Sequence, residues 1–264
     1  MKILVCVKQV PETETALALD RARRWVQEGG SFDLNDYDRY ALEEALRIKD
    51  KDAGSEVVVA SLGPERASQA LRTCLAMGAD RAVHLADPAF QDGDPFATAR
   101  ALAAVAKRES PDLLLVGLQA EDDNYCQTGV VLAEMLGLPH ATGVMAMSLL
   151  PGGQGVRAER ELEGERRLVV EMPLPAVVTV QTGINQPRYA SLRGIMAAKK
   201  KELKALSPAD LGLDPAKVGA AGALVERVDL DHPPKGKGGE LLKGTTEEMA
   251  RELVRRIREK TGVI

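Results

Sequence analysis

The chain has 264 residues, of which 45% are hydrophobic and 3% aromatic, and its formal net charge is −4. This mild negative charge and the scarcity of aromatic side chains argue against nucleic-acid binding, which needs cationic surfaces and base-stacking platforms. Three cysteines far apart in the sequence, Cys6, Cys74 and Cys126, predict no disulfide framework or metal site and fit a reducing compartment. The apolar run at the start is too short for a signal peptide or a membrane span, so we expect a cytoplasmic protein without membrane insertion.

The first half of the chain alternates short apolar runs with amphipathic segments. The apolar runs predict buried strands at residues 3–7, 56–61, 81–85 and 113–116. The segments between them predict helices that begin near Asn35 or Asp36, Ala67, Pro95 and Thr128. Residues 11–34 show no clear period and are expected to form a long excursion. This order predicts an α/β fold, a mostly parallel sheet with helices on both faces.

The loop after the fourth strand, residues 117–128, is the strongest candidate binding site. It carries consecutive acidic residues and opens a helix at Gln127 and Thr128, whose start offers N–H groups to an anion such as phosphate. Right-handed crossovers place the carboxyl ends of parallel strands at one edge, so this loop, Lys8 and residues 61–63 are expected to meet around one ligand. A capped loop without a ligand explains the same residues at least as well.

After Gly137 the alternation of strands and helices stops. Residues 142–149, 156–162 and 166–171 read as strands, with an exposed hairpin extension formed by the last two. Residues 175–180 return to the sheet as a buried strand.

A polar loop at residues 185–194 then carries a single apolar tip at Leu192, and a helix or turn that begins at Ile195 ends in a basic triplet. Such a triplet is usually a solvated surface, although beside an apolar loop it would steer an acidic partner. Residues 204–244 are expected to form an arm that lies on another surface, followed by a helix with a capping box at Thr245. We therefore expect an α/β domain at 1–203 and a C-terminal arm plus helix at 204–264.

The sequence contains no set of residues typical of an enzyme active site. Paired carboxylates, a metal-ligand cluster and a nucleophile–base pair are all missing, and His84, His140 and His232 are isolated. His84 lies within a predicted strand and is interpreted as a core or edge residue. The chain is therefore expected to be a carrier rather than an enzyme, with no catalytic residue and no metal site of its own.

Several segments together resemble the beta-subunit family of electron transfer flavoproteins over essentially the full length. The most specific is NQPRYASLRGIMAAKKKEL at 185–203, similar to the family signature of the Asn-Glu-Pro-Arg-Tyr-Ala-Thr-Leu-Pro type followed by Ile-Met and a lysine cluster. VCVKQV at 5–10, SLGP at 61–64, LAMGADRAVHL at 75–85 and VGLQAEDDNYCQTG at 116–129 support the resemblance.

The resemblance implies a fold like that of adenine nucleotide alpha-hydrolases and a heterodimer with an alpha subunit. In this family the alpha subunit makes most of the contacts to FAD, and the beta subunit binds AMP in a structural role. The assembly accepts electrons from flavin dehydrogenases such as acyl-CoA dehydrogenases and passes them to a membrane quinone oxidoreductase. The C-terminal arm and helix are then expected to pack on the alpha subunit.

The resemblance also implies which residues bind the cofactors and which dock the dehydrogenase. Tyr37 falls where an aromatic residue approaches the flavin, and Leu192 falls on the anchor leucine of the recognition loop at 185–201. The implied cofactor-binding residues are Cys6, Asn35, Asp36, Tyr37, Asp38, Leu62, Gly117, Gln119, Ala120, Asp122, Asp123, Asn124, Cys126, Gln127 and Thr128. The implied docking residues are Tyr189, Leu192, Ile195, Met196, Lys199, Lys200 and Lys201.

Two alternatives stay open at this point. One is a flavin-bifurcating relative, in which the same beta-subunit loop holds a second FAD and the complex oxidises NADH. The other is a stand-alone nucleotide-binding module, because a fold does not fix a function.

Overall fold

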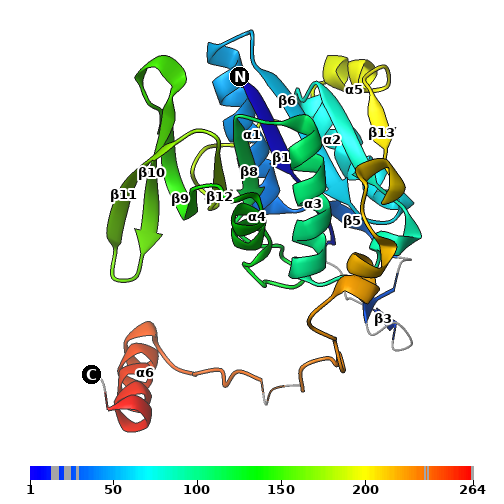
Figure 1. Cartoon of the computed structure of the whole chain (residues 1–264). Coiled ribbons are helices and arrows are strands. Elements are labelled where there is room, and N and C mark those ends of the chain that lie inside the picture. Colours follow the sequence, from blue (N-terminus) through cyan, green and yellow to red (C-terminus); the bar gives the residue numbers. More distant parts are fainter. Residues whose placement is uncertain (13–17, 21–24, 28–29, 235, 237, 263–264) are drawn as a thin grey trace. The chain divides into compact units, whose positions relative to one another are not determined.

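A β-sheet that is nine-stranded over the described residues organises this computed structural model (Figure 1), which describes residues 1–12, 18–20, 25–27, 30–234, 236 and 238–262. The strand order is β11-β10-β9-β12-β8-β1-β6-β7-β13, and the strands from β9 to β13 in this order run parallel. Their bounds are β1 (Lys2–Cys6), β6 (Glu56–Leu62), β7 (Arg81–Leu85), β8 (Leu113–Gly117), β9 (His140–Leu149), β10 (Gly155–Leu162), β11 (Arg166–Pro173), β12 (Ala176–Val180) and β13 (Leu203–Ala205). The predicted mostly parallel α/β sheet is confirmed.

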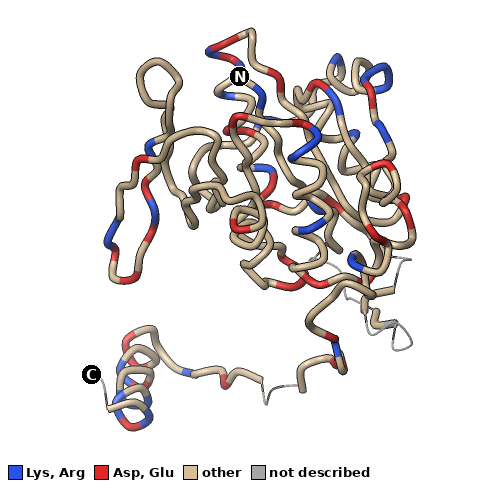
Figure 2. Tube along the Cα trace, in the orientation of Figure 1, with Lys and Arg blue, Asp and Glu red and all other residues tan. Residues whose placement is uncertain are grey.

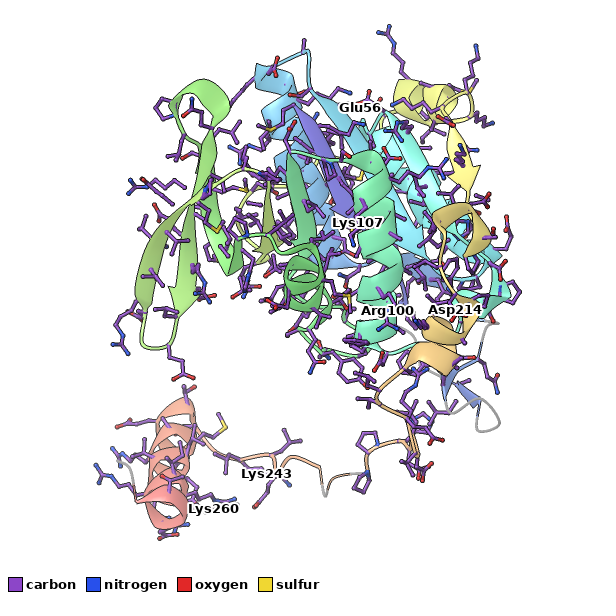
Figure 3. The ribbon with its side chains drawn as sticks, viewed as in Figure 1. Glu56, Arg100, Lys107, Asp214, Lys243 and Lys260 are labelled. Carbon is purple, nitrogen blue, oxygen red and sulfur yellow. The ribbon has the colours of Figure 1, made fainter. Side chains whose placement is uncertain are left out.

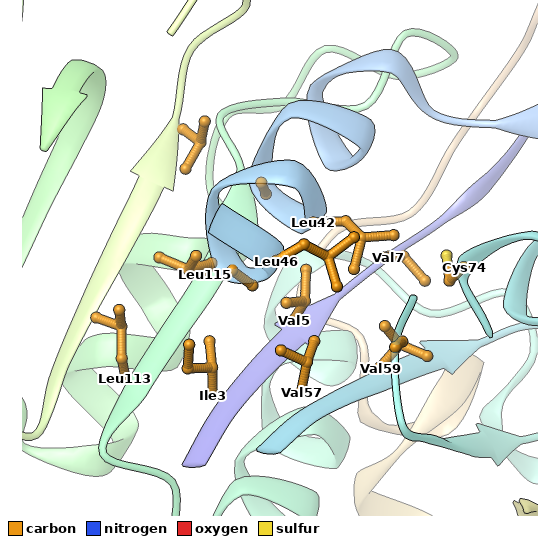
Figure 4. Close-up of a cluster of buried hydrophobic side chains, with 14 of the residues drawn as sticks. Ile3, Val5, Val7, Leu42, Leu46, Val57, Val59, Cys74, Leu113 and Leu115 are labelled. Carbon is orange, nitrogen blue, oxygen red and sulfur yellow. The ribbon is translucent and has the colours of Figure 1, made fainter. Parts of the chain in front are cut away.

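Helices cover both faces of the parallel strands because successive strand residues point to opposite faces. One face packs on α1 (Asp36–Lys51) and α2 (Ser68–Met77), and the other packs on α3 (Pro95–Glu109) and α4 (Thr128–Leu136). Figure 4 shows the first of these cores, where Val5 and Leu115 of adjacent strands meet Leu42 and Leu46 of α1. Short 3₁₀ turns connect the elements at Glu65–Ala67, Pro88–Phe90 and Pro151–Gly153.

The order of the parallel strands creates a topological switch point between β1 and β8. From β1 the chain proceeds through β6 to β7, and then returns to place β8 on the other side of β1. In open sheets of this kind ligands bind beyond the carboxyl ends of the strands at the switch point. The loops after β1 and β8 therefore lie where this class of fold binds its ligands.

The hairpin of β10 and β11 extends the sheet by antiparallel pairing with β9, as the alternating sequence predicts. Val156 and Ala158 are buried, whereas Arg157 between them is exposed. The alternation decides the burial because neighbouring residues of a strand point to opposite faces.

The excursion between β1 and α1 contains short strands that the sequence did not indicate. β2 (Gln9–Pro11) pairs antiparallel with β5 (Phe32–Leu34), and β3 (Leu19–Asp20) pairs with β4 (Trp25–Val26). Strands of two or three residues are too short to show a hydrophobic period. Residues 13–17, 21–24 and 28–29 of the predicted excursion lie outside the described residues.

The first compact unit, Met1–Val228, extends beyond the expected boundary at residue 203. β13 adds to β7 in parallel, and 3₁₀ turns at Ala209–Leu211, Pro215–Lys217 and Gly219–Gly222 follow. Arg100 of α3 donates a hydrogen bond to the Lys217 carbonyl at 2.8 Å, and Figure 3 shows Arg100 and Asp214 in this region. The carboxylate of Asp94 accepts the backbone N–H groups of Leu224 and Val225 at 2.8 and 3.0 Å. These polar contacts hold a segment that the sequence pattern assigns to the arm.

The second unit, Asp229–Ile264, contains α6 (Thr246–Thr261). The predicted capping box is confirmed, because the Thr245 and Glu248 side chains each bond to the other residue's backbone N–H. Figure 2 shows basic and acidic residues interleaved on this helix, and several form ion pairs such as Arg255 with Glu259. Lys235 and Lys237 of the preceding glycine-rich run lie outside the described residues.

Removing the Leu115 side chain tests the central core. Leu115 of β8 is fully buried, so we expect Leu115→Ala to lower the free energy of unfolding by about 2–5 kcal/mol, as cavity formation does in other cores. Leu168→Ala on the exposed part of β11 is the matched control, with an expected cost of under about 1 kcal/mol. Urea unfolding followed by circular dichroism measures both, and equal losses would contradict this assignment of the core.

Candidate functional site

The Asp38 carboxylate joins the carboxyl ends of β1 and β8. Its Oδ2 accepts the Lys8 backbone N–H at 2.7 Å, and its Oδ1 accepts the Gly117 backbone N–H at 3.1 Å. A Cβ on Gly117 would lie 2.3 Å from Asp38 Oδ1, so only glycine permits this approach. We call Lys8, Asn35, Asp38 and residues 117–128 the switch-point site, because they surround the ends of β1 and β8.

Burial raises the pKa of the Asp38 carboxyl to about 7, although the hydrogen bonds from Lys8, Asn35 and Gly117 oppose this change. The side chain is 4% exposed, and taking a carboxylate out of water disfavours its charged form. Asp38 is therefore poised to change its protonation near neutral pH.

Asn35 shapes the loop that follows β8. Its Nδ2 donates to the Gln119 carbonyl at 2.9 Å, and its Oδ1 accepts the Glu121 backbone N–H at 3.1 Å. The helix α1 begins at Asp36 with Asn35 at its N-cap, as predicted, but the Asn35 side chain makes no capping bond within the described chain and binds across to the loop instead. Asp36 itself is exposed.

Lys8 forms an ion pair with the acidic part of the same loop. Its Nζ lies 2.6 Å from Asp122 Oδ1 and 2.9 Å from Asp123 Oδ2. Burial favours the neutral amine, but the two carboxylates outweigh burial and raise the pKa of Lys8. The family resemblance does not place Lys8 among the cofactor-binding residues. The order of the strands does predict its place at the site, because Lys8 comes directly after a buried strand.

The middle of the loop is held by Gln119 and adopts an uncommon backbone. Gln119 Nε2 donates to the Tyr37 hydroxyl at 3.1 Å, and its Oε1 accepts the Cys126 thiol at 2.9 Å. Asn124 and Cys126 have left-handed φ values of 52° and 55°. Turns that combine right- and left-handed residues orient successive N–H groups toward an anion. The Asn124 N–H is itself used by the Ala120 carbonyl at 2.8 Å.

The start of α4 fits a phosphate group. The helix begins at Thr128, and within the described chain its N-cap residue Gln127 makes no side-chain capping bond. The first N–H groups of a helix have no acceptor within the helix, so this end can bind an anion. At the same edge of the sheet, the buried Ser61 hydroxyl has no hydrogen-bond partner among the described residues. These features make the loop and the start of α4 a candidate anion site.

Two predicted site residues lie mainly in the core. Cys6 is buried beside Leu4 and Val116, and burial together with Asp38 raises the pKa of its thiol to about 12. Leu62 is half-buried and packs against the same cluster. Their side chains therefore belong to the core that packs under the loops of the switch-point site. His84, expected as a core or edge residue, is buried, and its Nε2 lies 3.1 Å from the Gly63 carbonyl.

The predicted recognition loop differs from its expected form. The helix α5 (Leu192–Ala198) begins at Leu192 and not at Ile195, because the Ser191 hydroxyl accepts the Gly194 N–H at 3.0 Å and caps the helix. The expected single apolar tip is also wrong. Four apolar side chains are exposed, namely Tyr189 (95%), Leu192 (84%), Met196 (64%) and Ile195 (44%).

The basic triplet after α5 divides into two groups. Lys199 and Lys200 are exposed, whereas the Lys201 ammonium donates to the Leu75 and Ala79 carbonyls at 3.0 and 2.6 Å. Lys201 is expected to dock a partner, but its ammonium group donates to carbonyl groups of this chain. Lys199 and Lys200 remain available to an acidic surface.

In the described part of the chain, no group of three or more His, Cys, Asp or Glu side chains is arranged to hold a metal ion. None of the helices in that part is long and apolar enough to span a membrane.

The fold and the switch-point site define an open α/β protein with a candidate anion-binding loop beyond its parallel strands. Residues 24–211 match the electron transfer flavoprotein domain family. The chain is 42% identical to the electron transfer flavoprotein subunit beta of Methylophilus methylotrophus, covering 99% of this chain and 100% of that protein. It is 35% identical to the human subunit beta over 96% of both chains. A third relative, the caffeyl-CoA reductase-Etf complex subunit CarD of Acetobacterium woodii, is 39% identical over 98% of this chain and 99% of its own length.

The chain belongs to the electron transfer flavoprotein family, and the predicted resemblance to its beta subunits is confirmed. Its function is electron transfer, as a carrier subunit of a flavoprotein. The family is flavoprotein-associated and a beta subunit implies an alpha partner, which agrees with the expected heterodimer and with FAD as its cofactor.

The pKa of Asp38 leads to a test by pH. Between the ordinary value of 3.8 and about 7, the folded chain binds one proton more than the unfolded chain. The contribution of Asp38 to stability is therefore present at low pH and falls as the pH rises through this window. We expect Asp38→Asn to remove up to about 1.4 kcal/mol per pH unit of this slope, measured by urea unfolding of both proteins from pH 5 to 8. Identical slopes would refute the assignment.

Proposed function

We propose that this chain is the beta subunit of a heterodimer that binds AMP at the switch-point site and docks flavin dehydrogenases through α5. FAD, held mainly by the alpha subunit, supplies the redox chemistry when bound. The assembly accepts electrons from flavin dehydrogenases such as acyl-CoA dehydrogenases and passes them to a membrane quinone oxidoreductase. We propose a cytoplasmic location, no membrane insertion and no nucleic-acid partner.

The observation that carries the AMP proposal is the arrangement of the loop between β8 and α4. Asp38 and Asn35 hold the first residues of this loop, and the uncapped start of α4 at its other end leaves N–H groups for the phosphate. Asp122, Gln127 and Thr128 are the side chains proposed for direct contacts. Lys8 holds Asp122 in place, and its positive charge balances the acidic loop beside the phosphate.

The docking proposal rests on the apolar surface at Tyr189, Leu192, Ile195 and Met196. Exposed apolar side chains in contiguous groups mark interaction sites, because burying them on association is favourable. Lys199 and Lys200 beside them would steer an acidic partner and raise the association rate. The arm and α6 are proposed to pack on the alpha subunit, since α6 has no buried residue within the described chain.

A flavin-bifurcating complex is the second candidate, and the 39% identity to a subunit of the caffeyl-CoA reductase-Etf complex favours keeping it. The same loop would then hold a second FAD and the complex would oxidise NADH. A stand-alone nucleotide-binding module is the weakest candidate, because similarity to beta subunits extends over almost the whole chain.

Cofactor extraction separates the first two candidates. The chain is coexpressed with its alpha subunit, the purified complex is denatured, and the released nucleotides are quantified by chromatography. We expect one FAD and one AMP per heterodimer. Two FAD with little AMP would overturn the AMP proposal in favour of bifurcation, and a stable monomer without a flavin partner would support the stand-alone module.

Leu192→Ala tests docking. Leu192 is largely exposed at the start of α5, so its removal should not disturb the fold but should cost about 2 kcal/mol or more of dehydrogenase binding if it is an interface hot spot. We expect a lower electron-transfer rate at limiting concentrations of the heterodimer, with AMP and FAD content unchanged. Leu168→Ala, an exposed leucine of β11 outside the docking residues, is the matched control. Unchanged transfer in Leu192→Ala would reject this role.

A further inference from the structure

The helix α5 exposes its apolar side chains although it has seven residues and little core of its own. Ala198 is buried, whereas Leu192 and Met196 are exposed. Helices of this length are not stable by themselves in water, so tertiary contacts must hold the helix in place. The contacts that do so come from α2.

Arg72 of α2 and Lys201, which follows α5, each donate hydrogen bonds to carbonyl groups at the carboxyl end of the other helix. Arg72 of α2 donates from Nη1 to the Ala198 and Lys201 carbonyls at 2.7 and 3.1 Å. In return, Lys201 donates from Nζ to the Leu75 and Ala79 carbonyls at 3.0 and 2.6 Å. The last carbonyls of a helix have no partner within the helix and carry partial negative charge, so a cation satisfies both requirements.

Close backbone approach accompanies this exchange. A Cβ on Gly194 would lie 2.1 Å from the Ala76 carbonyl oxygen, so a side chain at this position would push α5 away from α2. Asp80, the carboxylate that acts on Lys201, is paired with Lys49, whose Nζ lies 2.5 Å from Asp80 Oδ1. Lys201 is thus directed at carbonyl groups and is not part of an exposed basic patch.

The other end of the docking segment, residues 185–201, is fixed separately. Arg188 binds the buried Glu43 through Nε and Nη2 at 2.8 and 2.9 Å, and it also reaches Asp50 at 2.7 Å. The segment is therefore held by α1 at its start and by α2 at its end. Between these attachments lie the exposed apolar residues.

We propose that Arg72 and Lys201 form a reciprocal clasp that positions the apolar side of α5 for the dehydrogenase, and that they are positioning residues and not contacts. This inference rests on the proposed docking function. It divides the basic triplet by role: Lys199 and Lys200 act on the partner through charge, and Lys201 acts on the orientation of α5. The two roles differ in their response to salt, because salt screens the long-range attraction of Lys199 and Lys200 for a partner much more than the short hydrogen bonds that Arg72 and Lys201 donate to carbonyl groups.

The test compares Lys201→Met, Arg72→Ala and Lys200→Met in the complete heterodimer. Steady-state transfer from a purified acyl-CoA dehydrogenase gives KM for the heterodimer and kcat at low and high salt. We expect Lys201→Met and Arg72→Ala to raise KM about fivefold or more at both salt concentrations, with kcat within about twofold. Lys200→Met is expected to raise KM at low salt and to match the wild type at high salt. Lys201→Arg, which keeps a cation, should restore most of the loss.

Hydrogen exchange reports on the clasp independently of the kinetics. Amides of residues 192–198 should exchange faster in Lys201→Met and Arg72→Ala, with FAD content unchanged. If Leu192→Ala raises KM but the clasp variants leave KM and exchange unchanged, the clasp is refuted and docking stands. If Leu192→Ala also leaves KM unchanged, the docking function itself fails. An effect of Lys201→Met that disappears at high salt would make Lys201 a steering charge and overturn the proposal.

Discussion

The buried carboxylate of Asp38 is the interaction on which the switch-point site depends. It accepts the N–H group of Lys8, just after β1, and that of Gly117, the last residue of β8. These two strands are far apart in the chain but are neighbours in the sheet. Each of these N–H groups would otherwise be buried without a partner, at a cost of about 1–3 kcal/mol. Because Asp38 lies in the first turn of α1, the same carboxylate fixes that helix against the sheet.

The helix α1 links the two regions to which we assign function. Its first residues, with Asn35 just before them, hold the loop at 117–128. Further along, Glu43 binds Arg188, and the Tyr40 carbonyl together with Glu44 accepts from Asn185 at 3.0 Å in each case. The candidate nucleotide loop and the docking segment are therefore attached to one rigid element. A nucleotide bound as proposed would lie beside the first turn of α1, the same helix that holds the docking segment.

The charged groups of the chain act mostly on its own backbone and on each other. Lys8 pairs with Asp122 and Asp123, Arg188 with Glu43, and Lys201 with helix carbonyls. Such pairs contribute orientation more than net stability, since removing charges from water offsets much of their attraction.

The sequence by itself determined the elements whose signal is local. Apolar runs predicted β1, β6, β7 and β8, while Asp94 before Pro95 and the Thr245 capping box predicted where α3 and α6 begin. It also indicated the loop at 117–128 and the family. Tertiary structure decided the rest, because those features join residues distant in the chain: Asn35 binds a loop 84 positions away, and Lys201 binds a carbonyl 126 positions away. The same holds for β13, whose three residues carry too short a pattern to read and become a strand because β7 offers them an edge. A local pattern encodes which backbone a segment favours, but the partner of a side chain depends on which distant segment the fold brings beside it.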